Sequence, residues 1–237
     1  MWWPSCLNAR DLGGLPVRGG GVLRSGVFIR SDSLSRLSDE GCVAVRESSP
    51  VRIIDLRAEW ECAREPSPLA RASANVHVPL VEPAGAPRAA TLAGRYRDQL
   101  HRCAGAIAMA VAAIADAPEG MVVVHCHSGK DRTGLVVGLV LSALGVPAKV
   151  IAADYALSAD RLATLHAGEL AACEDRQHRA VLCELRSARP ETMRATLAYL
   201  EHEFGGAAAY LERLGLRRVQ LAALSERFVQ MPAEVSG

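Results

Sequence analysis

Residues 125–134 read His-Cys-His-Ser-Gly-Lys-Asp-Arg-Thr-Gly and lie between two apolar segments of different length. The short run Met-Val-Val-Val at 121–124 predicts a buried strand, and the stretch at 133–144 predicts a helix that ends at Gly145 and Pro147. A loop between a strand and a helix directs backbone N–H groups and the helix N-terminus toward one point. This stretch therefore predicts an anion-binding loop at the end of a buried strand.

Strands and helices alternate on either side of this loop. The β-branched run at 51–56 predicts a second buried strand, a shorter strand is expected at 76–79, and the apolar spacing over 92–115 predicts a helix. This order predicts an α/β fold with a central, mainly parallel sheet and flanking helices. Helices are expected in the C-terminal third at 149–157, 159–187, 190–204, 207–214 and 217–229.

Gly-rich turns dominate the N-terminal segment. The apolar pieces at 22–23 and 27–29 predict a small hairpin, and residues 38–48 predict a short helix. No repeat and no linker divides the chain, so a single domain over 1–237 is expected.

Composition excludes several classes of protein. The chain has 27 basic and 26 acidic residues, a net charge of +1, which argues against a protein held on nucleic acid by its overall charge, so no nucleic-acid partner is expected. The longest apolar runs, at 104–115 and 134–148, fall short of the roughly 20 residues that span a bilayer, so no stable membrane insertion is expected. Seven irregularly spaced Cys and the lack of a signal peptide favour a reducing, cytoplasmic setting. Neither a metal nor another cofactor is expected, and the oligomeric state stays open.

The spacing from Cys126 to Arg132 is associated with attack of a thiolate on phosphate, but spacing alone is weak evidence. Only Lys130 and Lys149 among the 27 basic residues are Lys, so Arg is frequent and chance matches are expected. The same spacing occurs at Cys173 to Arg179 and at Cys183 to Arg189. Only Cys126 follows a buried strand and precedes a helix, and this context singles it out.

The residues around Cys126 suit phosphate chemistry. Gly129 and Gly134 let the backbone curve closely around an anion, and Arg132 can direct two parallel hydrogen bonds to phosphoryl oxygens. The Thr133 hydroxyl is placed to bond the sulfur of Cys126. An ordinary thiol is only a few per cent thiolate at neutral pH, so the loop dipoles and Arg132 are expected to favour the thiolate form.

The loop HCHSGKDRTG resembles the signature of the cysteine-based protein tyrosine phosphatase superfamily. Its GKDRTG form is similar to the atypical bacterial branch, which is linked to dual specificity and phosphoinositide activity. The resemblance also includes NARDLGG at 8–14, R-S-D at 30–32, and D-L-R at 55–57 with Glu59 and Glu61. Further similar stretches are 154–158 and 189–211, so the resemblance covers most of the chain.

This resemblance implies a role for each residue of the loop. Cys126 is expected to be the nucleophile and Arg132 the phosphate clamp, with backbone N–H groups of residues 127–132, including Ser128 and Gly129, completing the cradle. Asp131 is the favoured general acid. The alternatives are Asp55, at the end of the 51–56 strand, and Asp98, in a helical pattern that also fits a solvated face. Asp131 can instead hold Arg10 or Arg132 in place.

Other candidates have two interpretations each. Lys130 can bind a second phosphate of the substrate or anchor the loop, and His127 can face substrate or solvent. Arg10 and Asp11 can border the site or form a turn. His125 is expected to orient the loop from behind, and the helices over 158–188 form either a lid or an ordinary solvated surface.

The function expected from this resemblance is a metal-independent phosphatase. Its partners would be phosphorylated proteins carrying phosphotyrosine, phosphoserine or phosphothreonine, or phosphoinositides. One alternative is a phosphoinositide-preferring phosphatase. A rhodanese-like or arsenate-reducing enzyme is less consistent, since no other Cys has an obvious resolving position. A binding module without activity is disfavoured by the intact Cys126, Asp131, Arg132 and Thr133.

Overall fold

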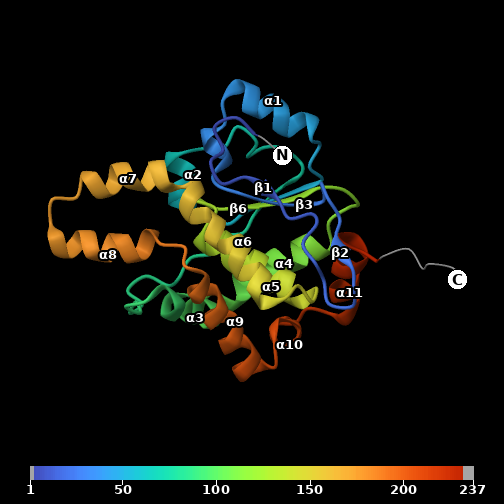
Figure 1. The fold of residues 1–237 in the computed structure, drawn as a ribbon. Coiled ribbons are helices and arrows are strands. Elements are labelled where there is room, and N and C mark those ends of the chain that lie inside the picture. The colour runs from blue at the N-terminus through green and yellow to red at the C-terminus, as the bar shows by residue number, and fades with distance from the viewer. Residues whose placement is uncertain (1–2, 232–237) are drawn as a thin grey trace, which may run out of the picture.

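The computed structural model describes residues 3–231 and places the anion-binding loop at the end of the central strand of a five-stranded sheet (Figure 1). The strands are ordered β1-β3-β6-β4-β5. Their bounds are β1 (Arg10–Asp11), β3 (Phe28–Ser31), β6 (Val122–His125), β4 (Arg52–Asp55) and β5 (Asn75–His77). The pairs β3–β6, β6–β4 and β4–β5 are parallel, and β1 is an antiparallel edge strand. The predicted α/β fold with a mainly parallel sheet is confirmed.

Both faces of this sheet are buried, which explains its nearly continuous apolar strands. In β6, Val122 and Val124 pack into the larger hydrophobic cluster, whereas Val123 packs into a second cluster on the other face. Helix α1 (Asp39–Glu47) covers the face of Val123, and α4 (Ala104–Ala115) and α5 (Asp131–Ala143) lie against the other (Figure 1). The alternation fixes the register of β6 and so the position at which the loop leaves it.

The remaining helices surround this core. Helix α2 (Glu59–Arg64) follows β4, and α3 (Leu92–Arg102) is separated from α4 by Cys103, so the helix expected over 92–115 is interrupted. The later helices are α6 (Ala148–Arg161), α7 (Ala163–Ala171), α8 (Arg176–Arg186), α9 (Pro190–Phe204), α10 (Ala207–Arg213) and α11 (Arg218–Phe228). A 3-10 turn, η1, covers Leu34–Arg36.

The N-terminal hairpin expected at 22–29 does not form. Strand β2 (Val22–Leu23) instead pairs with β7 (Val229–Gln230) in a separate two-stranded sheet, and Phe28 begins β3 of the main sheet. The two pieces therefore belong to different sheets: β2 pairs with the distant β7, whereas β3 lies between β1 and β6.

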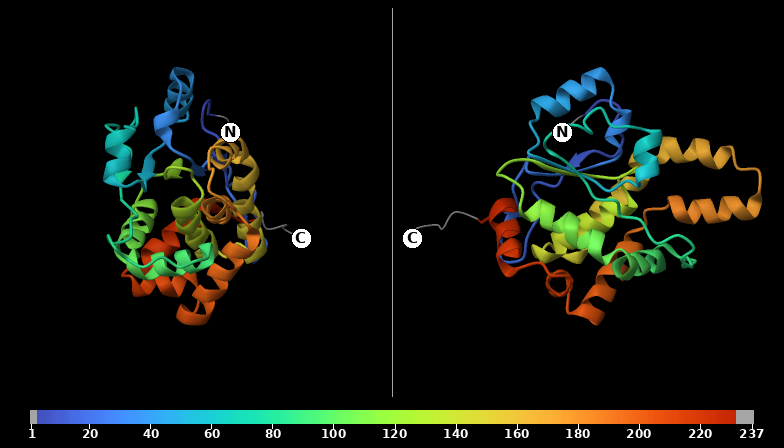
Figure 2. Two further views of the ribbon diagram at one scale, coloured as in Figure 1. Left: turned by 90° about the vertical axis from the view of Figure 1, so that its left-hand side faces the viewer. Right: turned by 180° about the vertical axis from the view of Figure 1, so that it is seen from behind.

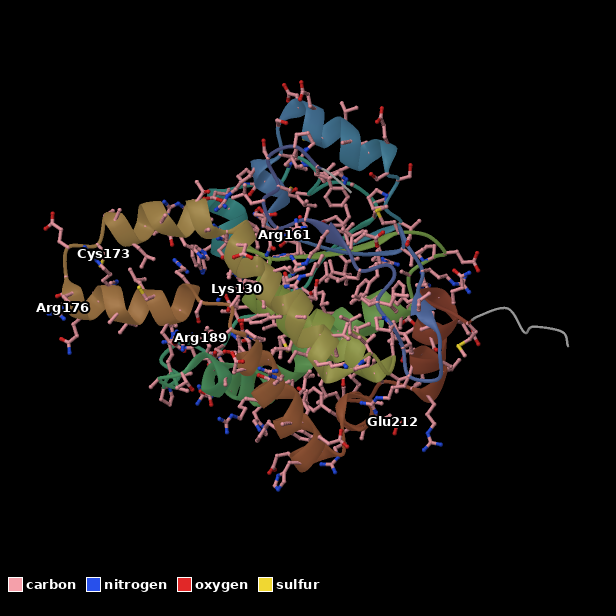
Figure 3. All side chains as sticks on the ribbon, viewed as in Figure 1. Lys130, Arg161, Cys173, Arg176, Arg189 and Glu212 are labelled. Atoms are coloured by element: carbon pink, nitrogen blue, oxygen red, sulfur yellow. The ribbon has the colours of Figure 1, made fainter. Side chains whose placement is uncertain are left out.

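The helix expected over 159–187 is divided among the end of α6, α7 and α8. Asp175 ends the connection between α7 and α8, since its side chain accepts a hydrogen bond of 2.6 Å from the N–H of His178 and caps α8. The two helices project from the body as a pair, with Cys173 near the outer tip (Figures 2 and 3). The Cys173–Arg179 spacing therefore lies far from the sheet and forms no anion-binding loop.

No helix within residues 3–231 combines enough length with enough apolar character to span a membrane.

Candidate active site

Cys126 lies directly after β6 at the carboxyl edge of the sheet, and α5 begins five residues later at Asp131. The residue is 1% exposed. Within the described part of the chain, the backbone N–H groups of residues 127–132 donate to no protein acceptor. These groups and the N-terminus of α5 form a set of donors beside the Cys126 side chain, as expected of an anion-binding loop.

The carbonyl groups of the loop point outward, to donors of neighbouring segments. The carbonyl of His127 accepts from the N–H of Ser33 at 3.0 Å, and that of Ser128 accepts from Asn8 Nδ2 at 3.0 Å. A further hydrogen bond, of 2.7 Å, joins Arg30 Nη2 to the carbonyl of Gly129. Because donors outside the loop bind these carbonyl groups, the backbone N–H groups are free to face the interior of the loop.

Gly129 is required at the closest approach of the loop to β3. Its φ of +67° lies in the left-handed region. A Cβ atom here would be 2.4 Å from the carbonyl oxygen of Ser31 and 2.6 Å from the nitrogen of Asp32. Any larger residue would push the loop away from the sheet.

Arg132 is held by a carboxylate for which the sequence assigned no role. Its Nη1 and Nη2 bond Glu61 Oε2 and Oε1 at 2.5 and 2.8 Å, and Oε2 also accepts from the N–H of Ala58 at 2.7 Å. Burial raises the pKa of Glu61, but the hydrogen bonds from Arg132 and Ala58 outweigh it and lower the pKa. Glu61 occupies one end of the guanidinium and leaves the edge formed by Nε–H and the second N–H of Nη2 for a phosphate.

Asp131 is oriented by three side chains. Its Oδ1 accepts a hydrogen bond of 2.6 Å from the Tyr96 hydroxyl and pairs with Lys130 Nζ at 2.8 Å. The Tyr155 hydroxyl lies 2.7 Å from that of Tyr96, whose own hydrogen is directed to Asp131, so Tyr155 donates. Asp131 also lines a small cleft of about 240 Å³ with Arg132, and in the described residues Oδ2 has no hydrogen-bond partner.

Lys130 is buried, and its contacts favour the anchoring alternative. Besides Asp131, its ammonium donates to the carbonyls of Leu185 and Ser187 at 2.9 and 2.8 Å. All three ammonium N–H groups thus have acceptors in the protein. Lys130 joins the loop to the inner end of α8 (Figure 3).

Asp55 lies behind the loop and is poorly suited to proton donation. Burial raises its pKa, but His125 and the hydrogen bonds from Arg57 outweigh this and lower the pKa to about 2. Arg57 bonds it through Nε and Nη2, at 3.0 and 2.7 Å. His125, whose pKa is lowered by burial, contacts the Cys126 carbonyl through Nδ1 at 3.3 Å, consistent with orientation of the loop from behind. Asp55 therefore lies behind the loop with a lowered pKa, whereas Asp131 lines the cleft beside Arg132.

Three other expected residues lie outside the set around Cys126. Asp98 pairs with Arg102 of the same helix at 3.7 Å and does not line the clefts beside Arg132. Asp11 accepts from the N–H groups of Gly13 and Gly26 at 2.9 and 2.7 Å, which is the turn-forming alternative. Arg10 is buried and pairs with Asp154 at 2.7 Å. Asp131 contacts Lys130 and Tyr96 and does not hold Arg10.

His127 and Thr133, within the stretch 125–134, are the two remaining residues for which the sequence predicted a contact. His127 contacts Arg36 Nη2 at 3.1 Å and lines a cleft of about 290 Å³ with Trp60, so its ring lies at the entrance of the site. The hydrogen bond expected from Thr133 to the sulfur of Cys126 is not formed, because the buried Thr133 hydroxyl has no partner among the described residues.

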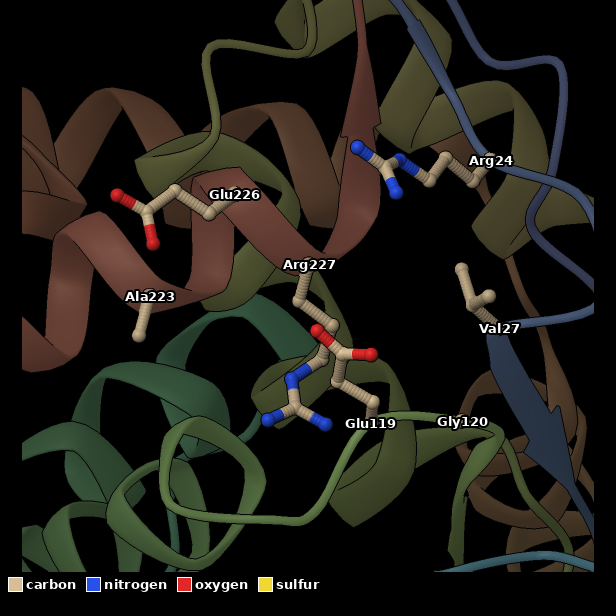
Figure 4. Close-up of a pocket in the computed structure, with 7 residues that line it drawn as sticks. All are labelled: Arg24, Val27, Glu119, Gly120, Ala223, Glu226 and Arg227. Atoms are coloured by element: carbon tan, nitrogen blue, oxygen red, sulfur yellow. The ribbon is translucent and has the colours of Figure 1, made fainter.

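Another pocket lies at the opposite edge of the sheet (Figure 4). It has a volume of about 290 Å³ and includes Val27 and Gly120, which precede β3 and β6. Its charged lining residues are of both signs, two Arg and two Glu. Over residues 3–231, no three His, Cys, Asp or Glu side chains form a metal-binding group.

Glu61 and Tyr96 are the residues that sequence reasoning missed. Glu61 stands in the stretch after the D-L-R element, and that position was its only signal. Tyr96 had no signal, because its partner Asp131 lies 35 residues further along the chain.

Comparison with known proteins gives consistent matches. Residues 1–230 match the family described as "Tyrosine phosphatase family". A tyrosine-protein phosphatase of Nostoc commune is 30% identical over 222 residues, covering 86% of this chain and 74% of that protein. The triple specificity protein phosphatase PtpB of Mycobacterium tuberculosis is 31% identical over 199 residues, covering 69% and 71%. A putative tyrosine-protein phosphatase of Cupriavidus necator is 29% identical over 178 residues, covering 69% and 64%.

Proposed function

The chain belongs to the tyrosine phosphatase family, and on that premise we propose that it hydrolyses phosphotyrosine in proteins through a phosphocysteine intermediate, without a metal ion. The proposal assigns residues 1–237 to one catalytic domain. It is carried by a single observation: Cys126 lies beside a loop whose N–H groups have no protein acceptor and whose carbonyls are bound from outside. Such a loop suits a phosphate dianion, which has several acceptor oxygens and negative charge.

In the first step, the phosphate binds to the loop N–H groups and to the open edge of Arg132. The thiolate of Cys126 attacks phosphorus, an S–P bond forms, and the bond to the leaving oxygen breaks. Asp131 gives its proton to that oxygen, so the tyrosine leaves as a neutral phenol. Developing charge on the phosphoryl oxygens is stabilised by donors that are already oriented.

In the second step, water attacks the phosphocysteine. Asp131, now a carboxylate, takes a proton from the water while a P–O bond forms and the S–P bond breaks. Inorganic phosphate and the thiolate are released, and Asp131 is again protonated. Atoms and charge balance over the two steps, and no redox partner is needed.

The range of substrates is part of the same proposal. The relative named a triple specificity protein phosphatase supports a site that accepts phosphoserine and phosphothreonine as well as phosphotyrosine. A preference for phosphoinositides has less support, because Lys130 is bound to two carbonyls and to Asp131. A phosphopeptide and phosphoinositide panel compared by kcat/KM tests this directly, and phosphotyrosine peptides should have the highest values.

Other thiol chemistry is tested in parallel. Thiosulfate sulfur transfer and arsenate reduction should be undetectable under conditions in which an aryl phosphate is hydrolysed, and hydrolysis should persist in chelator. Sulfur transfer or arsenate reduction faster than phosphate hydrolysis would contradict the proposed reaction.

A further inference from the structure

A second, larger cleft adjoins the candidate site. It has a volume of about 840 Å³ and lies between α2, α3 and the segment 80–88. Arg95, Gln99 and Arg132 line both this cleft and the small one that contains Asp131. A substrate whose phosphate reaches Arg132 would therefore extend past Arg95 into the larger cleft.

The charges around this cleft are not balanced. Its carboxylates have partners: Glu61 pairs with Arg132, and Glu82 pairs with Arg102 at 3.1 Å. Arg88 and Arg95 have no carboxylate partner among the described residues. Arg95 donates from Nε to the carbonyl of Ala89 at 3.0 Å, which uses one of its five N–H groups.

An apolar surface lies on the same cleft. Trp60 is 66% exposed and Val81 is 49% exposed, and both line it together with Pro83. A single exposed apolar side chain is ordinary, but a Trp beside two unpaired arginines and a catalytic site has the composition of a recognition surface. The cleft thus offers positive charge and apolar area within one surface.

We propose that this cleft binds the polypeptide next to the phosphorylated residue, with Arg95 pairing an acidic side chain of the substrate. Arg88 adds a second positive charge, and Trp60 packs against an apolar substrate side chain. A phosphorylated inositol ring could use the arginines, but its hydroxyl and phosphate groups offer nothing apolar to Trp60 and Val81. A protein segment supplies both kinds of group.

This inference rests on the proposed phosphatase function, and its test compares two phosphotyrosine peptides. One peptide has glutamates on both sides of the phosphotyrosine and the other has glutamines there; they are otherwise identical. The wild type should hydrolyse the acidic peptide with a kcat/KM about tenfold higher, mainly through a lower KM, as a charge-assisted pair predicts. Arg95→Gln should reduce this ratio to about twofold, the remainder being due to Arg88.

Arg97→Gln is the matched control, because Arg97 is on the same helix, is exposed and lines neither cleft. It should keep the wild-type ratio, which separates a local pair from general charge. Trp60→Ala should raise the KM for both peptides about fivefold, because it removes apolar contact area. An unchanged melting temperature shows that each variant is folded.

Three outcomes would overturn the inference. They are an active wild type with equal kcat/KM on both peptides, an Arg95→Gln variant that keeps the full ratio, and an Arg95→Gln variant impaired only toward a multiply phosphorylated inositol. The last would assign the arginines to a different class of substrate. If the wild type hydrolyses no phosphate ester at all, the proposed function fails and the peptide site falls with it.

Discussion

The hydroxyl of Tyr96 donates a hydrogen bond of 2.6 Å to Oδ1 of Asp131, the same oxygen that pairs with Lys130. Two donors on one oxygen fix the orientation of the carboxyl group and leave Oδ2 without a partner among the described residues, in a side chain that lines the small cleft with Arg132. Tyr96 stays protonated for this role, because burial raises its pKa well above the ordinary value. Tyr96 is thus a positioning residue for the proposed acid.

Substitution of Tyr96 or Asp131 should slow the departure of the leaving group. Asp131→Asn should lower kcat for phosphotyrosine about 100-fold, since general acid catalysis contributes about this much, and Tyr96→Phe should lower it about tenfold. Hydrolysis of an aryl phosphate with a strongly acidic phenol should slow far less in both variants. Kinetics over a series of leaving groups measure this, and equal slowing across the series would assign the acid role to another residue.

Glu61 should matter through Arg132. Glu61→Gln removes the charge that holds the guanidinium, so the clamp loses its fixed orientation and kcat/KM should fall about 30-fold. Glu59→Gln is the control, because Glu59 lies on the same helix and is exposed. Inhibition by inorganic phosphate should weaken only in Glu61→Gln, and equal inhibition of both variants would contradict the positioning role.

Gly129 should tolerate no side chain. Gly129→Ala places a Cβ against Ser31 at a positive φ and should lower the free energy of unfolding by about 2 kcal/mol while abolishing most activity. Gly168→Ala, in α7 with open space around it, should instead raise the free energy of unfolding by about 0.5 kcal/mol. Chemical denaturation measures both, and a stable, fully active Gly129→Ala enzyme would contradict this role of the glycine.

Asp55 should make stability depend on pH in a defined direction. Its folded pKa of about 2 lies below the unfolded value of about 3.9, so its ionised form stabilises the fold above pH 4. That contribution, about 2 kcal/mol, is lost as the pH falls toward 2. The difference in unfolding free energy between wild type and Asp55→Asn should therefore shrink over this window. A difference that stays constant between pH 5 and 2 would show that Asp55 has an ordinary pKa.

Lys130 should stabilise the packing of the α7–α8 helix pair against the body of the protein. Lys130→Met leaves the carbonyls of Leu185 and Ser187 without their donor, so proteolysis within 163–186 should become several-fold faster. If Lys130 instead binds a second phosphate, the variant should lose activity only on multiply phosphorylated headgroups and keep the wild-type digestion pattern.

The part of the site that is contiguous in sequence could be predicted from it. The strand, the loop and the start of α5 near Asp131 follow from local periodicity and from the glycines, and β6 and α5 confirm the strand and the helix. Local patterns could not reveal Glu61, which reaches Arg132 across 71 residues. They also placed Val22 in a hairpin, because nothing near it indicates its partner Gln230. The features that the sequence failed to predict depend mainly on contacts between segments that are distant in the chain.

The most direct test of the central claim is rapid denaturation of the enzyme during turnover of a radiolabelled phosphotyrosine peptide, followed by mapping of the label. The account predicts labelled phosphate on the peptide that contains Cys126, and no label and no turnover in Cys126→Ser, which should still bind the substrate. Label on another residue, or turnover by Cys126→Ser, would contradict it.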